Sequence, residues 1–267
     1  MSGKKKFLVD VSLCCGCYNC QLSCKDEHVD NDWRPYAAPQ PNIGQFWLKM
    51  HDFECGTLPK VRLHYIPVMC AHCENAACIN ACGENAIVKR SDGLVIIDPE
   101  RCTGCGKCAA ACPIDAIYMN STLSIAQKCT GCAHLLDNGR AEPRCVGVCP
   151  TGALKFVDED EIPEEAVSFV PEEAGSSAYY INIPGKFVAG AVVDMKKHMA
   201  IEGAVCTLTI NGRKFETQTD AFGDFWLENV PEEAGQLQIQ AEGYAPKELM
   251  VASGSDSVNV GDIDISE

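Results

Sequence analysis

Hydrophobic and polar positions follow a different pattern in each half of the chain. In the first half, apolar runs are short and lie between cysteine-rich segments; residues 85–98, for example, read as two strands around a turn at Ser91–Gly93. From residue 186 onward, about seven short runs of β-type residues are separated by turn signals such as Asn211–Gly212. Short strands at this spacing favour an antiparallel sandwich.

Sixteen of the nineteen cysteines fall into four runs, all of them before residue 150. Residues 102–113, CTGCGKCAAACP, have the spacing C-x2-C-x2-C-x3-C followed by proline, which is the bacterial ferredoxin pattern for a [4Fe–4S] cluster. The run at 14–24 repeats this spacing, the run at 70–82 has C-x2-C-x4-C-x3-C, and the run at 129–149 has C-x2-C-x12-C-x3-C before Pro150. The sequence therefore predicts four [4Fe–4S] clusters.

The fourth cysteine of each run is expected to serve the cluster of another run. Three thiolates on a tight loop reach three corners of one iron–sulfur cube, and the fourth lies about one helical turn further on. The two inner runs form a two-fold repeat, so they exchange fourth ligands, and the outer runs are left to each other. The predicted iron ligands are Cys70, Cys73, Cys78 with Cys112; Cys102, Cys105, Cys108 with Cys82; Cys14, Cys17, Cys20 with Cys149; and Cys129, Cys132, Cys145 with Cys24.

Structural zinc is the alternative for such cysteines. Zinc sites usually combine two separated C-x2-C pairs, whereas two runs here place three cysteines within seven residues, which favours iron–sulfur. Cys15 and Cys55 are left over, Cys55 as a free thiol, and Cys206 is expected in an apolar core. His72 and His134 are expected to be neighbours of the ligands or surface residues, not iron ligands. No catalytic residue is predicted.

These patterns predict an α+β chain with three parts. Residues 1–157 form a tandem two-cluster ferredoxin-like domain, 158–185 an acidic linker or strap, and 186–267 the all-β sandwich. A helix is expected over 164–170. Residues 29–69, rich in proline, asparagine and aromatic residues, are expected to form a long ordered loop that covers a cluster or contacts a partner.

Charge excludes some partners. The formal net charge is −15 before any cluster is counted, so nucleic acid and anionic lipid are poor partners. An acidic surface suits docking onto a basic patch of a redox partner, and solubility alone is the alternative. No apolar segment follows the basic start MSGKKK, and none is long enough to span a membrane. A cytoplasmic location is expected, with export on a partner's signal as the alternative.

The cysteine runs resemble a known family. CCGCYNCQLSC, CAHCENAACINAC, GLVIIDPERCTGCGKCAAACP and KCTGCAHLLDNG…CVGVCP are similar to the four-cluster iron–sulfur subunit of molybdopterin oxidoreductases of the dimethyl sulfoxide reductase family. GAVVD…GAVCTLTING…TQTDAFGDFWLENV…AEGY looks like a transthyretin-like or carboxypeptidase-regulatory-like domain. Together they resemble small subunits of the pyrogallol–phloroglucinol transhydroxylase and catechol dehydroxylase type.

That resemblance implies a non-catalytic, electron-transfer subunit in a heterodimer from an anaerobic organism. Its large partner would carry molybdenum bound to two pterin guanine dinucleotides and act on hydroxylated aromatics, with a further redox partner as an option. Four complete ligand sets favour a reductive dehydroxylase over an internal hydroxyl transfer.

Three alternatives stay open: a stand-alone polyferredoxin, a subunit of another molybdenum or tungsten oxidoreductase, and an adhesion or carbohydrate-binding role for the sandwich. A soluble carrier has little use for an added β domain, which favours the subunit.

Overall fold

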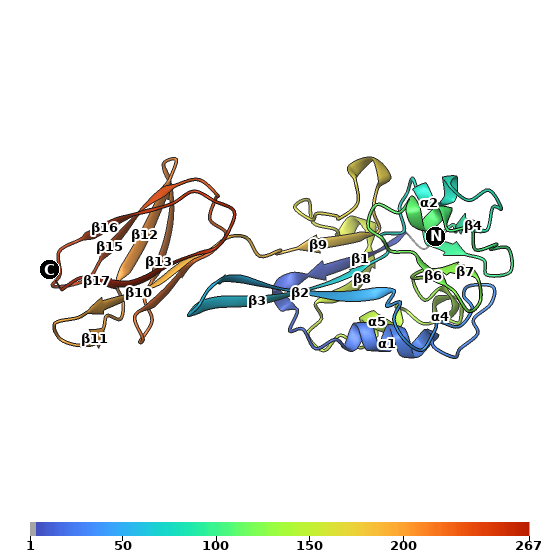
Figure 1. Ribbon diagram of the computed structural model, residues 1–267, viewed down its shortest axis with the longest axis horizontal. Helices are drawn as coiled ribbons and strands as arrows, with labels where there is room; N and C mark the ends of the chain where they lie inside the picture. The colour runs from blue at the N-terminus through green and yellow to red at the C-terminus, as the bar shows by residue number, and fades with distance from the viewer. Residues whose placement is uncertain (1–3, 267) are drawn as a thin grey trace. The chain divides into compact units, whose positions relative to one another are not determined.

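A computed structural model describes residues 4–266, and it divides into two compact units. The first unit comprises Met1–Asp52 and Tyr65–Ile183, and the second Phe53–His64 and Pro184–Glu267 (Figure 1). The division after Ile183 lies two residues before the boundary expected from the sequence. The expected strap therefore belongs to the first unit, while a segment from the first half of the chain belongs to the second.

A three-stranded sheet joins the ends of the first unit. β1 (Lys5–Asp10) lies in the middle, paired antiparallel with β8 (Leu154–Asp158) and parallel with β9 (Ala178–Ile181). Phe7 and Val9 of β1 are buried. The strand that follows the last cysteine run thus pairs with the first strand of the chain, and the strap supplies the other edge of the same sheet.

The two inner cysteine runs fold as a repeated half-unit, as expected. In each, a short helix precedes a two-stranded antiparallel hairpin, and apolar residues from both halves share one small core. The elements are α2 (Ala77–Asn80), β4 (Ile87–Lys89) and β5 (Val95–Ile97), then α3 (Lys107–Ala110), β6 (Tyr118–Asn120) and β7 (Ile125–Gln127).

Three further helices accompany the outer runs, and they contain Cys20, Cys24 and Cys145 of those runs. These are α1 (Asn19–His28), α4 (Ala133–Asp137) and α5 (Arg144–Gly147), and α1 packs on α5. Short 3-10 turns are η1 (Val11–Leu13), η2 (Glu159–Glu161) and η3 (Glu172–Ala174).

The prediction of a helix over residues 164–170 is wrong. Pro163 and Pro171 bracket this segment, and between them Val167 pairs through its backbone with Tyr180 as an isolated antiparallel bridge. Proline restricts the residue before it to extended conformations, which favours this strap-like course over a helix.

The segment expected as one long loop contains a hairpin. β2 (Leu48–Thr57) and β3 (Lys60–Met69) pair with each other, and only residues before Leu48 run as an irregular loop. The tip of the hairpin, Phe53–His64, is part of the second unit. There the Arg62 guanidinium lies 4.4 Å from the Trp226 ring centroid, and Lys60 forms an ion pair with Asp224.

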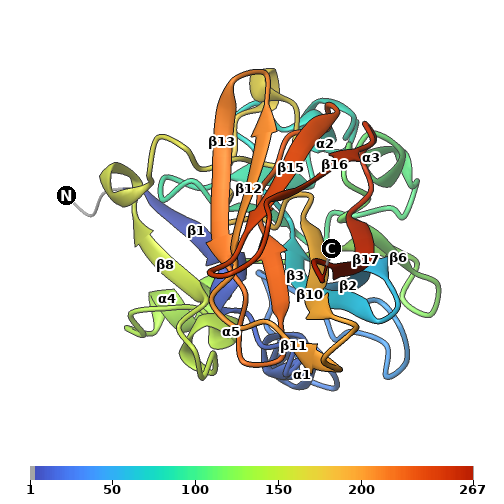
Figure 2. The same ribbon diagram turned by 90° about the vertical axis from the view of Figure 1, so that its left-hand side faces the viewer.

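The second unit is a sandwich of two four-stranded sheets (Figure 2). All seven expected runs are strands, and one short strand, β11, is added. One sheet contains β11 (Met199–Ala200), β10 (Val188–Asp194), β14 (Asp224–Leu227) and β17 (Val258–Asp264); the other contains β13 (Arg213–Gln218), β12 (Val205–Ile210), β15 (Gly235–Gln240) and β16 (Lys247–Val251). The pair β10–β17 is parallel, so the first sheet is mixed and not purely antiparallel.

The sandwich core is built by alternation. Buried and partly exposed residues alternate along β12 and β15, which places Leu208, Leu237 and Ile239 between the sheets with no more than 1% of each exposed. Cys206 lies in the same core, as expected.

Candidate iron–sulfur sites

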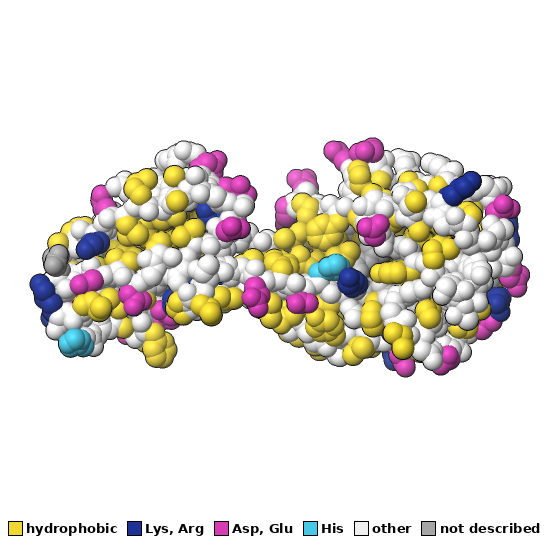
Figure 3. All heavy atoms as spheres, viewed as in Figure 1, with side chains coloured by type: hydrophobic (Ala, Val, Ile, Leu, Met, Phe, Trp, Pro, Cys, Tyr) yellow, Lys and Arg dark blue, Asp and Glu magenta, His cyan; other side chains and the backbone are white. Residues whose placement is uncertain are grey.

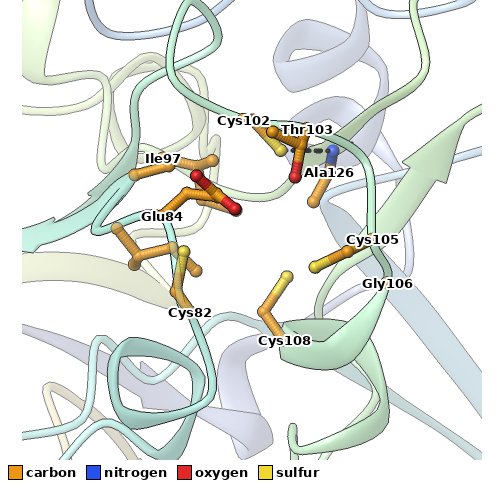
Figure 4. A pocket seen from close by; sticks show the side chains of 11 residues that line it. Cys82, Glu84, Ile97, Cys102, Thr103, Cys105, Gly106, Cys108 and Ala126 are labelled. Carbon is orange, nitrogen blue, oxygen red and sulfur yellow. Dashed lines mark hydrogen bonds between the residues drawn. The ribbon is translucent and has the colours of Figure 1, made fainter.

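Four cysteines from the two inner runs surround one pocket. Cys102, Cys105 and Cys108 come from the loop before α3 and from α3 itself, and Cys82 comes from the end of the other inner run. Their sulfur atoms point toward a shared space of about 320 Å³, beside which the Glu84 side chain lies (Figure 4). This is the set that the sequence predicts for one cluster.

The equivalent set of the two-fold repeat surrounds a second pocket. Cys70, Cys73, Cys78 and Cys112 line a space of about 370 Å³ together with small apolar side chains and Lys128. Fourth cysteines are exchanged between the runs because each run ends one turn beyond its own loop. The structure thus brings together the predicted residues of both inner sets; that they bind iron stays a prediction.

The outer runs also bring their cysteines together. Burial, and after it the proximity of Cys14, Cys149 and Cys17, raises the pKa of Cys20 to about 12. For this set the structure therefore joins the first three cysteines of the first run to the last cysteine of the fourth.

The last set lies where α1 packs on α5. Cys24 and Cys145 are buried in that contact, and burial raises the pKa of both thiols well above the usual value. The nearby thiols of Cys129 and Cys132 raise both values further. Each of the four predicted sets is thus a cluster of thiols in space.

The chemistry of these thiols fits an iron–sulfur group. Burial raises the pKa of Cys108 and of Cys129 to about 11, so the thiolate form at neutral pH calls for bound metal, which deprotonates a coordinating thiol outright. Within residues 4–266, no three His, Cys, Asp or Glu side chains converge closely enough to hold a single metal ion.

Backbone N–H groups are aimed at the sulfur atoms of all four sets. Each donates to a cysteine Sγ over 3.3–3.5 Å, a geometry that suits a negatively charged sulfur. The pairs are His72 N–H to Cys70, Ala116 to Cys112, Ala126 to Cys102, Gly131 to Cys129 and Leu154 to Cys149.

One backbone feature recurs at the second cysteine of every run. The residue just before it has a positive φ: 65° at Gly16, 42° at His72, 70° at Gly104 and 63° at Gly131. This left-handed residue turns the loop so that consecutive thiols face one space. This repeat is not among the features predicted above, although glycine at three of the four equivalent positions marks it in the sequence.

His72 and His134 are neighbours of the cysteines, and neither is a surface residue. His72 is fully buried, and its Nδ1 accepts a hydrogen bond from the Val95 N–H over 3.0 Å. His134 is 2% exposed, and its Nε2 lies 3.0 Å from a carboxylate oxygen of Glu27. Burial lowers the pKa of His72 well below its usual value, so this ring is neutral.

The remaining cysteines lie elsewhere. Cys15 is exposed beside the first run, and Cys55 lies on β2 within the second unit. No helix in the part of the chain that the structure describes is long and apolar enough to cross a membrane.

Two family models and several known proteins match this chain. A family model described as a 4Fe-4S dicluster domain matches residues 61–159, and a carboxypeptidase regulatory-like domain matches residues 188–265. The chain is 32% identical to the pyrogallol hydroxytransferase small subunit of Pelobacter acidigallici, over 95% of this chain and 96% of that one.

Further relatives match smaller shares of the chain. A subunit of the sulfite dehydrogenase of Allochromatium vinosum is 29% identical over 84% of this chain and 97% of its own length. The electron transfer subunit of the thiosulfate reductase of Salmonella typhi is 36% identical over 58% of this chain and 77% of its own length.

These relatives are subunits of multisubunit oxidoreductases, which implies a larger catalytic partner. The expected fold class is confirmed: a ferredoxin-like iron–sulfur part is followed by a regulatory-like β-sandwich. The chain belongs to the family of iron–sulfur electron-transfer subunits of oxidoreductases that includes the pyrogallol hydroxytransferase small subunit.

Proposed function

We propose that this chain holds four [4Fe–4S] clusters and carries electrons to or from the molybdopterin site of a large catalytic subunit that acts on hydroxylated aromatics. The observation that carries the proposal is the gathering of all sixteen predicted cysteines into four groups of four. The substrate class is supported by the similarity to the pyrogallol hydroxytransferase small subunit, which covers 95% of this chain.

When bound, such clusters supply one-electron transfer. The chain's own residues hold the ligands in place and limit the access of water. Cys24, Cys129 and Cys145 are each no more than 8% exposed, whereas Cys17 and Cys105 are exposed. The sets that contain the exposed thiols are those at which electrons would enter or leave, since transfer to a partner needs close approach.

The partner is proposed to contact this chain through complementary charge. Acidic side chains are spread over the face shown in Figure 3, with fewer basic ones between them. The net charge of −15 favours a partner with a basic docking surface.

Four complete sets of thiols also favour a reaction that consumes electrons, the reductive removal of a ring hydroxyl, over an internal hydroxyl transfer. We place the complex in the cytoplasm, which cell fractionation tests.

Purification of the native protein under anaerobic conditions tests the proposal. We expect a complex with a larger subunit, molybdenum on that subunit, and about sixteen iron and sixteen sulfide per copy of this chain, four of each for every cluster. Reduced complex should return electrons to a hydroxylated aromatic, seen as bleached visible absorbance that recovers on addition of substrate.

Other outcomes would contradict parts of this proposal. A native monomer without a molybdenum partner would point to a free polyferredoxin. Zinc without sulfide would refute the iron–sulfur sites. If a molybdenum partner is present but hydroxylated aromatics do not take up its electrons, only the proposed substrate class is refuted, and the electron-transfer role remains.

A further inference from the structure

A lysine lies buried at the edge of one of the cysteine pockets. Lys128 is 2% exposed and lines the pocket of Cys70, Cys73, Cys78 and Cys112. It immediately precedes Cys129, the first cysteine of another set. A lysine side chain therefore stands next to one set of thiols in space and next to another in sequence.

The ammonium group of Lys128 is held in place by backbone carbonyls. Its Nζ donates to the carbonyl oxygen of Val95 and, over 2.9 Å, to that of Cys129. An ammonium group has three N–H donors, and these two carbonyls account for two of them. Two buried carbonyl contacts fix the position of the charge.

The charge of Lys128 has no carboxylate to neutralise it among residues 4–266. Lys89 differs: it donates to the carbonyl of Cys73, but it also forms an ion pair with Glu74 over 2.9 Å and is more exposed. Burying an uncompensated cation is costly, so a nearby negative charge is needed. The sulfur ligands of the adjacent pocket are the negative groups available to Lys128, which lines that pocket together with Cys78 and Cys112.

We propose that Lys128 is a fixed internal counter-charge that raises the reduction potential of the iron–sulfur group bound by Cys70, Cys73, Cys78 and Cys112. Reduction adds one electron to this group and no proton, so the negative charge of the site grows by one. A cation held beside the site stabilises the reduced form more than the oxidised form. Lys128 is thus a positioning and tuning residue; it is not itself a ligand.

The proposal rests on the iron–sulfur function of the chain but not on its partner or substrate. The test is a redox titration of the purified holoprotein followed by electron paramagnetic resonance, with Lys128→Met compared with wild type. We expect one midpoint potential to fall so that the ratio of reduced to oxidised centre at a fixed potential drops at least tenfold, which is about 59 mV for a one-electron couple. The other potentials should move less.

Two further variants separate charge from packing. Lys128→Arg keeps the charge, and we expect it to restore most of the lost potential. Lys186→Met removes a lysine of similar burial, 9% exposed and bonded to a carbonyl, from the sandwich unit. We expect Lys186→Met to leave all the potentials at their wild-type values.

Iron and sulfide analysis shows whether the centres are intact in each variant. Full iron content with unchanged potentials in Lys128→Met would overturn the proposal, and so would an equal fall in Lys128→Met and Lys128→Arg. If Lys128→Met loses iron, Lys128→Arg and Lys128→Gln replace it in the titration, and the same two outcomes decide. Absence of a molybdenum partner would refute the wider function but leave this result standing.

Discussion

Gly104 and Gly106 offer a matched pair for testing how the cysteine loops are held open. Both lie in the run at 102–113 with nearly the same backbone angle, φ 70° and 73°. A Cβ added at Gly104 would lie 2.1 Å from the carbonyl oxygen of Ser124, whereas one added at Gly106 would meet nothing within 4 Å. Gly104→Ala and Gly106→Ala therefore share the same backbone strain and differ only in the steric clash.

The magnitudes follow from those distances. Either alanine pays about 1–2 kcal/mol for the left-handed conformation. Gly104→Ala must also push Ser124 back by more than an ångström to reach ordinary contact at 3.4 Å, which adds about 1–3 kcal/mol as overpacking does. Ser124 precedes β7, whose Ala126 N–H donates to Cys102. The shift thus disturbs a hydrogen bond to a predicted ligand as well as the loop itself.

The assay is iron and sulfide content together with thermal unfolding of the purified variants. We expect Gly104→Ala to lose about a quarter of its iron, the share of one cluster in four, and to unfold at a lower temperature. Gly106→Ala should keep its iron and lose only a little stability. Equal behaviour of the two variants would show that the close approach to Ser124 does not constrain the loop.

Further predictions concern the sandwich unit and the spare thiols. Leu208→Ala, at a fully buried site, should lower the free energy of unfolding by about 2–5 kcal/mol in urea titrations followed by tryptophan fluorescence, whereas Met250→Ala, at a site 70% exposed, should change it by less than about 0.5 kcal/mol; equal losses would refute the core assignment. Arg62→Ala should cost about 0.5–1 kcal/mol and shift Trp226 emission, since it removes the cation over that ring; an unaltered spectrum would count against the contact. Cys55→Ser should leave iron content unchanged, and any loss of iron would place Cys55 among the ligands.

Local spacing predicted most of the cysteine architecture. The spacing within each run determines its loop and short helix. The two-fold repeat of the inner runs then predicts that the last cysteine of each run joins the first three of the other, and Cys82 and Cys112 do so. The seven strands of the sandwich were visible for a similar reason, because alternation marks each strand without knowledge of its neighbours.

The predictions failed where the local pattern of residues does not decide the structure. Parallel pairing of β10 with β17 joins segments about seventy residues apart, and no local pattern distinguishes it from antiparallel pairing. The segment of β2 and β3 was predicted as a loop because proline is rare inside strands, yet the two strands pair with each other. The burial of Lys128 was equally hidden, since a lysine beside a cysteine run reads as a surface residue until its surroundings are known.

The hairpin of β2 and β3 has a consequence for synthesis of the chain. Its tip, Phe53–His64, leaves the ribosome some two hundred residues before the last strand of the sandwich to which it belongs. At translation rates of about 5–20 residues per second, that interval is on the order of 10–40 s. For most of this interval Trp226, over whose ring the Arg62 guanidinium will lie, has not yet been synthesised. A nascent chain therefore carries an unpartnered strand pair into the cell, and we expect chaperones that bind extended segments to recognise this hairpin before the C-terminal unit closes over it.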